Sequence, residues 1–422
     1  MKEYVGRILM LVEDYFPADV RVKNEAYTLT MAEYKVTVIA LRKPGEKAKE
    51  NVNGVSVYRI PKIELFQNKI KKPKGSRIAK YFNNAKLAFG YIFEYVYITL
   101  GCFFLSLYIS RKEGFDVIHV HNPPDTLFIV GAFYKIFGKQ FVFDHHDLSP
   151  ELYLSRYNVK DGFIYRGLLK VEKICLRTAN IVIATNESYK KIEIERGLLN
   201  PENVFVVRNG PDLNRIKLTA PDEHLKRLNK KIFGYVGEIN PQDGLDYLLR
   251  AIKILVSEIG RTDFLCIIIG SGDALEEMKK LAQTLDIEVY LWFTGFIPDE
   301  DMLRYLSTAD ICVDPDPASP LNNVSTWIKI MEYMALAKPI VSFDLAETRY
   351  TAQEAAIYVS PNDEKEFAKA IANLMDNPEE RKKMGERGFK RVVQKLAWQH
   401  VSKNLISAYG RLFNNLQNFA PN

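Results

Sequence analysis

Hydrophobic residues along the chain come in short runs rich in valine and isoleucine, separated by stretches with helical spacing. The runs are continuous rather than alternating, as in parallel strands buried on both faces. Helical stretches between such strands indicate right-handed βαβ units and a doubly wound sheet. We predict strands at RILMLVE, KVTVIAL, VSVYRI, DVIHVH, QFVFD, NIVIAT and VFVVRNG in the first half, and at KIFGYVG, FLCIIIG, VYLWFTG, DICVDP, KPIVSF and AAIYVS in the second.

The strand–helix rhythm is interrupted once, by the polar segment 212–231. A chain of 422 residues is also too long for one ordinary core. We therefore predict an N-terminal Rossmann-like domain over 1–211, a linker over 212–231 and a second Rossmann-like domain over 232–396. Residues 397–422 are expected to form a helix that packs back on the first domain and ends in a frayed tail.

Composition narrows the class of protein. Hydrophobic residues at 47% and charged residues at 26% are typical of a globular protein in water, and the net charge of +6 is modest, so no nucleic-acid partner is expected. The four cysteines are far apart in apolar segments, without metal or disulfide spacing, which favours a reducing compartment. The first apolar run is short and ends in Glu13 and Asp14, unlike a signal peptide. A cytoplasmic location is the expectation.

Polar side chains gather where predicted strands end. In doubly wound domains ligands bind at the carboxyl ends of the strands. His119, His121 and Asn122 close one run, and the tandem of 144–147, with sequence DHHD, closes the next. In the second half the corresponding positions are 237–238, 270–272, 294–297 and 314–323. We expect these positions to rim one cleft between the domains.

The stretch NNVSTWIKIMEYMALAKPI, residues 322–340, places two charges inside an apolar segment. A helix that begins near Ser325 would carry Ser325, Lys329 and Glu332 at i, i+4 and i+7, on one stripe. Ser325 and Thr326 are residue types that cap a helix start, and Pro339 follows its end. The polar stripe therefore faces a ligand or a buried partner.

Eight stretches, spread over nearly the whole chain, share their order and spacing with one enzyme family. They are RVKNEAYTLTMAEYKVTVIA, DVIHVHNPPD, FDHHDLSPELY, VVRNGPD, GYVGEINPQDGLDYLLRAI, IIIGSGDALEEMKKLA, FTGFIPDEDMLRYLSTADICVDP and STWIKIMEYMALAKPIV. Through them the chain resembles the retaining glycosyltransferases of family four, also called group one, which have the GT-B architecture of two Rossmann-like domains that face a central cleft. The resemblance implies transfer of a sugar from a nucleotide-sugar donor, bound by the second domain, to an acceptor held mainly by the first. It implies no cofactor or metal beyond the donor itself.

The resemblance also implies roles for individual residues. Glu332 matches the glutamate that accepts hydrogen bonds from the nucleotide ribose, because a carboxylate can take two hydroxyl donors. The helix start near Ser325 and Thr326, with Lys329, would face the diphosphate. His146 matches a catalytic histidine near the transferred sugar. The remaining expected contacts are Gly237, Glu238, Gly272 and Phe296 for the donor, and Asp19 and Arg21 for acceptor or phosphate.

Several of these assignments have a structural alternative. Glu332 would otherwise be a buried helix charge paired with a neighbouring cation such as Lys329, at i, i+3. His146 would otherwise be a structural histidine, as we expect for His145. The glycines at 270–272 would form only a tight turn. A metal at the tandem of histidine and aspartate is disfavoured, because no second cluster stands at ligand spacing.

The sequence departs from the family pattern at three places. Val324 stands eight positions before Glu332, where the family often has a second glutamate. Glu238 and Asp243 stand where the family often has a basic pair. The usual pair of glycines after the first strand is replaced by DYFPADVRV. Diphosphate would then depend on Lys329, on backbone amides or on basic residues of the first domain.

One segment, 87–109, is apolar on every side except for Glu94, and eight basic residues lie between 62 and 86. A helix of this kind is buried in protein or lies in lipid, and its length approaches that of a membrane span. Three readings stay open: a core crossover helix, a core helix with one face in the membrane, and a true span. The basic stretch favours an anionic membrane surface and a lipid-linked acceptor such as a polyprenyl-linked glycan, with the protein peripheral on the cytoplasmic face.

The reading that unites these features is a retaining hexosyltransferase of glycan or cell-surface polysaccharide biosynthesis. A GT-B epimerase that acts on a nucleotide sugar is the first alternative, and it would leave the basic, apolar segment without a purpose. A non-catalytic subunit that binds a nucleotide sugar is the second, and the valine at position 324 keeps it open. Sugar release from a donor, with and without a lipid acceptor, separates the three.

Overall fold

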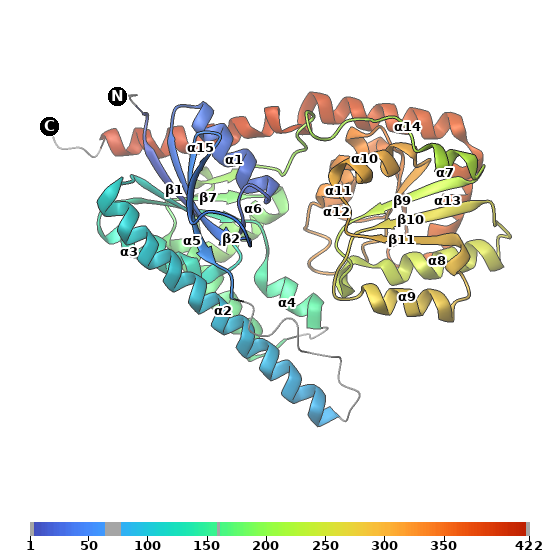
Figure 1. The fold of residues 1–422 in the computed structure, drawn as a ribbon, viewed down its shortest axis with the longest axis horizontal. Helices are drawn as coiled ribbons and strands as arrows, with labels where there is room; N and C mark the ends of the chain where they lie inside the picture. Colours follow the sequence, from blue (N-terminus) through green and yellow to red (C-terminus); the bar gives the residue numbers. More distant parts are fainter. Residues whose placement is uncertain (1–3, 64–76, 158–160, 419–422) are drawn as a thin grey trace. The chain divides into compact units, whose positions relative to one another are not determined.

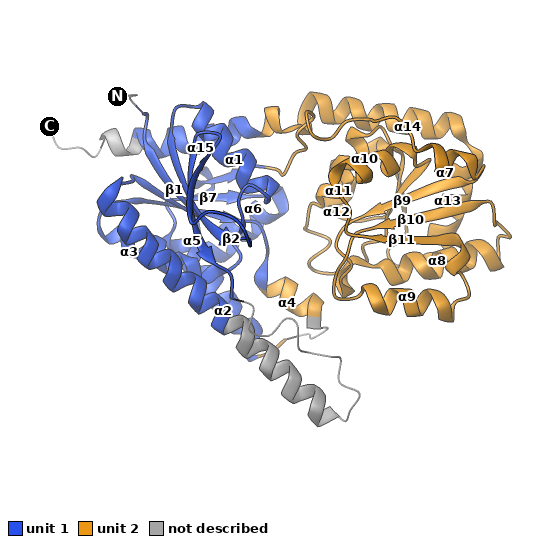
Figure 2. Cartoon of the chain, viewed as in Figure 1, with its two compact units in different colours: residues 1–149, 163–207, 402–422 blue, residues 150–162, 208–401 orange. Residues whose placement is uncertain are grey.

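The computed structural model describes residues 4–63, 77–157 and 161–418, with the backbone alone for 77–92, 157 and 415–418. The chain forms two compact units (Figure 2). Unit 1 contains residues 1–149, 163–207 and 402–422, and unit 2 contains residues 150–162 and 208–401. Each unit is built on one sheet of mainly parallel strands.

Unit 1 has an eight-stranded sheet in the order β3-β4-β2-β1-β5-β6-β7-β8. Figure 1 labels β1, β2 and β7 of this sheet. The strand order reverses between β1 and β5, which places a topological switch point at their carboxyl ends. All pairs are parallel except β3 with β4, and β3 is a short polar strand at the edge, which the search for apolar runs missed. The strands are β1 Arg7–Tyr15, β2 Lys35–Arg42, β3 Lys49–Val52, β4 Val55–Pro61, β5 Val117–His121, β6 Gln140–His145, β7 Ile181–Ala184 and β8 Val204–Val206, and the helices are α1 Val20–Met31, α2 Arg77–Lys112, α3 Phe128–Ile136, α5 Phe163–Thr178 and α6 Glu187–Gly197.

Unit 2 has a six-stranded, fully parallel sheet in the order β11-β10-β9-β12-β13-β14. Its switch point lies between β9 and β12. The prediction of two doubly wound Rossmann-like domains is therefore confirmed. The strands are β9 Lys231–Val236, β10 Phe264–Ile269, β11 Leu291–Gly295, β12 Ile311–Asp314, β13 Ile340–Phe343 and β14 Ala356–Val359, and the helices are α4 Ser149–Tyr157, α7 Glu223–Arg227, α8 Leu245–Ser257, α9 Leu275–Thr284, α10 Asp299–Thr308, α11 Ile328–Ala335, α12 Ala346–Ala352, α13 Glu364–Asp376 and α14 Pro378–Arg391.

The strands of unit 2 show why the apolar runs are continuous. Phe233 and Tyr235 on β9 are buried with α8 and α13 on one face of the sheet. Ile232, on the same strand, is buried with α10 and α11 on the other face. Because successive side chains of a strand point to opposite faces, a sheet covered on both sides needs apolar residues at every position.

Residues 212–231, expected to be a polar linker, instead form part of unit 2. Ile216 and Leu225 are buried in its core. Asp222 caps α7, because its side chain accepts a hydrogen bond from the backbone N–H of Leu225 at 3.0 Å. Two isolated apolar residues and a set of polar contacts, such as that of the Asp222 backbone N–H with Thr308, therefore anchor this segment, although its overall composition is polar.

The long helix α2 is the crossover between β4 and β5, and it contacts β1, β2 and β4. Ile98, Cys102 and Ile109 lie on its buried face. Gly101 allows a close approach to the sheet, because a Cβ there would meet the Ile60 side chain at 3.0 Å. The helix thus belongs to the core of unit 1 along one face.

The last helix, α15 Trp398–Asn418, packs on unit 1 over the residues from 402 onward. Tyr34 contacts the rings of Tyr409 and Phe413, with centroid distances of 5.6 and 5.3 Å. The buried hydroxyl of Tyr409 lies 2.8 Å from Nδ1 of His119, on β5. The end of the chain therefore helps to build the interior of unit 1.

We expect Tyr409→Phe to lower the free energy of unfolding by about 1–3 kcal/mol, because the change leaves a buried imidazole nitrogen without its partner. Urea unfolding followed by circular dichroism measures this loss. Ser407→Ala is the matched control on the same helix, because the Ser407 hydroxyl bonds only to the Lys403 carbonyl oxygen at an exposed position. An equal effect of both changes would contradict the role given to the Tyr409 hydroxyl.

Candidate active site

The loop after β1 leads into α1 at the switch point of unit 1. Asp19 is the N-cap of α1, and its Oδ1 accepts hydrogen bonds from the backbone N–H groups of Arg21 at 2.8 Å and Val22 at 3.2 Å. The Arg21 guanidinium lies 3.5 Å from Asp19 Oδ2. The structure therefore places both predicted acceptor or phosphate residues together, with Asp19 serving first as a helix cap.

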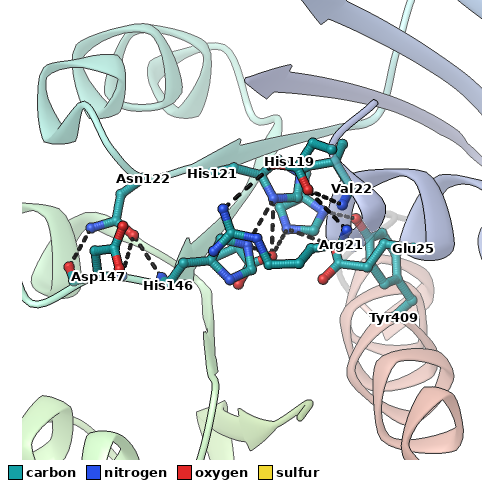
Figure 3. A network of polar contacts seen from close by, with 11 residues as sticks. Arg21, Val22, Glu25, His119, His121, Asn122, His146, Asp147 and Tyr409 are labelled. Carbon is teal, nitrogen blue, oxygen red and sulfur yellow. Dashed lines mark hydrogen bonds and ion pairs between the residues drawn. The ribbon is translucent and has the colours of Figure 1, made fainter. Parts of the chain in front are cut away.

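Beside this loop, three histidines surround one buried carboxylate (Figure 3). Asp144 Oδ2, on β6, lies 3.0 Å from His121 Nδ1, 3.0 Å from His146 Nε2 and 3.5 Å from His119 Nε2. Asp144 and His119 are completely buried. Glu25 reaches the same cluster from α1, with Oε2 3.8 Å from His119 Nε2. Residues from two strands and one helix thus form one polar cluster, which we call the histidine cluster.

The pKa values of the groups in the histidine cluster are shifted in different directions. Burial on its own raises the pKa of Asp144, but the charge of His146 and the hydrogen bonds from the three histidines outweigh it and lower the pKa well below its usual value. Burial, reinforced by the nearby charge of Asp144, raises the pKa of Glu25 well above its usual value. Burial also lowers the pKa of His119 to about 4. At neutral pH, Asp144 is thus ionised and His119 is neutral, and the environment of Glu25 favours its protonated form.

His146, the predicted catalytic residue, is held from two sides. Its backbone N–H donates to Asn122 Oδ1 at 2.6 Å, and its ring is stacked on that of His121 with an interplanar angle of 7°. Asn122 is itself anchored, because its amide donates to Asp125 Oδ1 at 2.9 Å and to the Asp147 carbonyl oxygen at 2.8 Å. The imidazole orientation is therefore fixed before any ligand binds.

The neighbouring His145 faces a different environment. Its Nδ1 lies 3.0 Å from Glu193 Oε1 and its Nε2 lies 3.5 Å from Glu172 Oε1, both fully buried. Burial opposes protonation, but these carboxylates outweigh it and raise the pKa of His145 to about 9. His145 is thus a buried cation that ties β6 to α5 and α6.

Among the described residues, Glu25, His119, His121 and Asp144 have the geometry of a metal-ligand set, with ligand atoms within 4.8 Å of one another. Imidazole and carboxylate donors suit Zn²⁺. The second nitrogen of His119 already has a hydrogen-bond partner in Tyr409, as metal-bound histidines do. The second nitrogen of His121 has no hydrogen-bond partner among the described residues, which leaves that outer shell incomplete. The sequence-based expectation of no metal stays a prediction.

In unit 2, Lys329 lies at the carboxyl ends of β9 and β12. Its Nζ is 3.0 Å from Asp314 Oδ1 and 2.8 Å from Asp316 Oδ2, and it lies over the Tyr235 ring at 5.1 Å. Burial disfavours its charge, but Asp316 and its neighbours outweigh this and raise the pKa of Lys329 well above its usual value. Lys329 does not pair with Glu332, so this example of the structural alternative is wrong, although Glu332 does have a cation as its partner, as that alternative expected.

Glu332 instead contacts Arg215, from the segment before α7. Arg215 Nη1 donates to Glu332 Oε1 at 3.1 Å, and its other nitrogens bind Asp299 at 2.6 and 2.9 Å. Burial is the main reason that the pKa of Glu332 is raised, and Arg215 opposes the rise. Only one carboxylate oxygen is used by Arg215, which leaves Oε2 to accept a bond from a ligand hydroxyl.

The expected helix start at Ser325 is wrong. Helix α11 begins at Ile328, with Trp327 as an N-cap that makes no side-chain cap. The Ser325 hydroxyl donates to the Leu321 carbonyl oxygen at 2.9 Å, and the Thr326 hydroxyl bonds to Glu347 at 3.2 Å. These contacts hold both residues outside the helix, so they do not share its polar stripe.

The remaining predicted donor contacts lie around the carboxyl ends of β9, β10 and β11. A Cβ at position 272 would meet the Ile239 carbonyl oxygen at 2.5 Å, so Gly272 permits a close backbone approach. Glu238 is exposed and accepts a bond from Asn240 at 2.7 Å. Phe296 is 85% exposed just after β11, where its ring is open to a ligand. Gly237 lies at the end of β9, and its backbone N–H donates to Ile269.

Sequence reasoning missed three residues of these clusters. Glu25 lies inside α1, where a glutamate reads as a surface residue. Tyr409 lies near the end of the chain, almost 300 positions from its partner. Arg215 lies in the segment predicted to be a linker, where a single basic residue does not indicate a binding site. All three depend on contacts distant in sequence.

Comparisons with known proteins now bear on these clusters. A family model described as Glycosyltransferase Family 4 matches residues 18–215, and a model described as Glycosyl transferases group 1 matches residues 217–391. An uncharacterized glycosyltransferase of Methanocaldococcus jannaschii is 22% identical over 374 residues, with 86% of each chain covered.

Solved structures show the same fold. Sucrose-phosphate synthase from Thermosynechococcus elongatus has a TM-score of 0.73 at 18% identity, and covers 97% of this chain and 100% of its own. HepE of Anabaena, in a complex with UDP-glucose, has a TM-score of 0.66 at 18% identity, with 95% and 100% covered. The predicted GT-B fold class is thus confirmed, and the cleft between its domains stays a prediction.

We expect His146→Ala to lower turnover on the order of 100-fold, as for loss of one donor to developing charge, while free nucleotide diphosphate binds as before. Steady-state kinetics and calorimetry measure the two quantities. His145→Ala is the contrasting variant, because it removes the buried cation beside Glu193 and should lower stability and activity together, while Glu172 keeps its ion pair with Arg196. If His146→Ala behaves in the same way, its role is structural.

We expect Glu332→Gln to weaken nucleotide-sugar binding by about 1–3 kcal/mol, as for a hydrogen bond to a charged group. Isothermal titration measures the change, and Glu300→Gln, at an exposed position on α10, is the matched control. Donor affinity and turnover that stay at the wild-type level in Glu332→Gln would rule out the ribose contact.

Proposed function

Since the chain belongs to the group-one glycosyltransferases, we propose that it transfers a sugar from a nucleotide-sugar donor to a lipid-linked acceptor, with retention of anomeric configuration. The observation that carries the acceptor half of this proposal is an exposed apolar face on α2. The donor half is supported by the carboxylate and lysine at the switch point of unit 2.

The donor would lie at the carboxyl ends of the unit 2 strands, as ligands do in this class of sheet. Glu332 Oε2 accepts from a ribose hydroxyl, and the Arg215 bond to Oε1 fixes the carboxylate in place. The likeness to HepE, whose structure contains UDP-glucose, supports a nucleotide sugar as the ligand. Phe296 offers an exposed ring beside this region.

Lys329 is proposed to face the diphosphate. The loop after β9 carries Glu238 and Asp243, so it supplies no cation there. Burial raises the pKa of Asp243 to about 6, so this side chain is still mostly negatively charged at pH 7. Lys329, held between Asp314 and Asp316, is the basic residue of α11 and is therefore our candidate for the diphosphate contact. We propose that no metal ion is required for the transfer.

The transfer step keeps the stereochemistry because both bonds change on one face of the sugar. The bond from the anomeric carbon to the phosphate oxygen breaks, and its electron pair stays with the nucleoside diphosphate. The acceptor hydroxyl oxygen bonds to the anomeric carbon from the same side, and its proton passes to the leaving phosphate oxygen. His146 stabilises the reacting sugar from unit 1, and the protein mainly supplies fixed charges and donors.

The exposed face of α2 carries five large apolar side chains, which we call the α2 stripe. They are spaced at three and four residues along the helix, so they share one face. Phe104, for example, is 64% exposed. An apolar stripe of this length on the surface marks a site of interaction with protein or membrane. Its members are Phe93, Val96, Leu100, Phe104 and Tyr108.

The stripe continues onto α3. Phe103 contacts Phe133 at 4.9 Å, and Phe133 contacts Phe137 at 5.1 Å, so the aromatic residues of the two helices adjoin. Ile136 and Phe137 are also exposed. Two exposed basic residues, Arg111 and Lys112, end α2. This arrangement suits a helix that lies in the interface of an anionic membrane.

By length and composition, Phe93–Lys112 is the one helix of the described chain that passes as a candidate membrane span. Its buried face packs on the sheet of unit 1, which favours the reading of a core helix with one face toward lipid. The basic residues 69–86 predicted to face the membrane lie outside the described side chains. A peripheral position on the cytoplasmic face of a membrane is part of this proposal.

The two alternatives from the sequence are less well supported. An epimerase acts on the nucleotide sugar alone and has no acceptor, so no substrate would contact the α2 stripe. A non-catalytic subunit would not need His146 held in one orientation. Release of nucleotide diphosphate with and without a lipid acceptor distinguishes both from a transferase.

We expect Leu100→Ser/Phe104→Ser to reduce sedimentation with vesicles of phosphatidylcholine and phosphatidylglycerol in equal parts, without loss of donor hydrolysis. Attachment by charge should also weaken with salt, because exposed charges are screened beyond about 8 Å at physiological ionic strength. Met31→Ser is the matched control, because Met31 is an exposed apolar residue at the end of α1. Failure of the wild-type protein to bind these vesicles at low salt, with equal transfer to a soluble acceptor, would refute the lipid-linked assignment.

A further inference from the structure

A cavity of about 200 Å³ lies at the carboxyl ends of β1 and β4 in unit 1, against α2. It is distinct from the histidine cluster, with which it shares no lining residue. An apolar cavity of about 150 Å³ is enough to hold a benzene ring, so this one has room for a six-membered ring. Its polar and aromatic lining consists of Glu13, Asp14, Tyr15, Lys62, Glu94 and Tyr97.

The backbone of β1 is irregular where it lines the cavity. The pairing register of β1 with β2 shifts between Leu11 and Tyr15. In a regular strand, Glu13 and Asp14 would point to opposite faces. Here both line one cavity, together with Tyr15. Irregularities of this kind re-aim side chains and are frequent beside binding sites.

Two aromatic rings in the lining are held in place. The Tyr97 hydroxyl donates to the Pro61 carbonyl oxygen at 2.8 Å, which ties α2 to the end of β4. Tyr15 has the ammonium groups of Lys43 and Lys62 over its ring, at 4.9 and 5.6 Å. Fixed aromatic surfaces with a few convergent polar groups are typical of small-molecule sites.

The charges of the lining select a class of ligand. Carboxyl groups of Glu13, Asp14 and Glu94 line the cavity with Lys62, and Lys43 lies over the Tyr15 ring, so charges of both signs are present and the lining selects neither an anion nor a cation. Burial, with the charges of Glu94 and Asp14, raises the pKa of Glu13 to about 8, so Glu13 is a neutral hydroxyl donor at pH 7. Asp14 and Glu94 accept hydrogen bonds, and Lys62 donates them. A mixture of donors, acceptors and aromatic rings matches an uncharged molecule rich in hydroxyl groups.

The cavity also adjoins the α2 stripe. Glu94 and Tyr97 line the cavity, while Phe93 and Val96 lie on the exposed apolar face of the same turns. One helix therefore offers a polar pocket and an apolar surface side by side. An amphiphile with a sugar head and a hydrocarbon tail meets both.

We propose that this cavity binds one sugar ring of the glycan part of the acceptor. This inference rests on the proposed transfer to a lipid-linked acceptor, and it names a subsite for that acceptor in unit 1.

Saturation-transfer NMR on the full chain tests the cavity with three probes, the methyl β-glycosides of glucose, galactose and N-acetylglucosamine. We expect at least one to bind, and Glu13→Leu/Glu94→Leu to weaken its binding about tenfold or more, since two polar partners are lost. Glu195→Leu, at an exposed position of α6, is the matched control and should bind as the wild type does. The melting temperature of each variant confirms that it is folded.

A second variant gives a readout that a structural role of Glu13 would not produce. In the wild type, glycoside binding should fall as the pH rises through about 8, because Glu13 then ionises and its carboxylate can no longer donate a hydrogen bond to the sugar. Glu13→Gln keeps a neutral donor at the same place, so its binding should stay level over that range.

The outcomes separate this inference from the proposed function. Release of nucleotide diphosphate from UDP-, GDP- and ADP-sugars is measured on the same samples. Donor turnover with no glycoside bound, or with binding that the double variant leaves intact, would overturn the cavity assignment alone. Absence of donor turnover in the wild type would overturn the proposed function instead.

Discussion

Both sheets of this protein are covered on both faces, and this constraint decides where polar chemistry can occur. A buried parallel strand has no position for a charged side chain along its length unless that charge has partners. Polar residues therefore gather at the carboxyl ends of the strands and in the helices that follow them. The histidine cluster of unit 1 lies at the switch point of its sheet. The group of Lys329, Asp314 and Asp316 lies at the switch point of the sheet of unit 2.

The two clusters solve the problem of buried charge in opposite ways. In unit 1 one ionised carboxylate, Asp144, is surrounded by three imidazoles, and the pKa of the adjacent Glu25 is raised well above its usual value by burial. In unit 2 one lysine is held between two aspartates. Isolated ions in such places would cost several kcal/mol each, so each charge has its partners within hydrogen-bond distance. Fixed partners also mean that both sites are oriented before a substrate arrives.

The two faces of α2 have different surroundings. One face of this helix completes the core of unit 1, and the other face exposes the five apolar side chains of the α2 stripe. Core packing cannot account for the exposed face. The lipid-linked acceptor that we propose would contact both the stripe and the polar cavity beside it, since an amphiphile has a part suited to each.

The sequence by itself determined the fold class, because continuous apolar runs separated by helical stretches have few other solutions than parallel sheets covered on both sides. It also indicated the strand ends where His119, His121, Asp144 and Asp314 lie, since those positions follow directly from the runs. The tertiary structure alone decided the partners. Arg215 and Tyr409 reach their sites from segments distant in sequence, and no local pattern records such a contact. It also decided that α11 begins at Ile328, after Ser325 and Thr326, whose hydroxyls bond to Leu321 and Glu347 outside that helix.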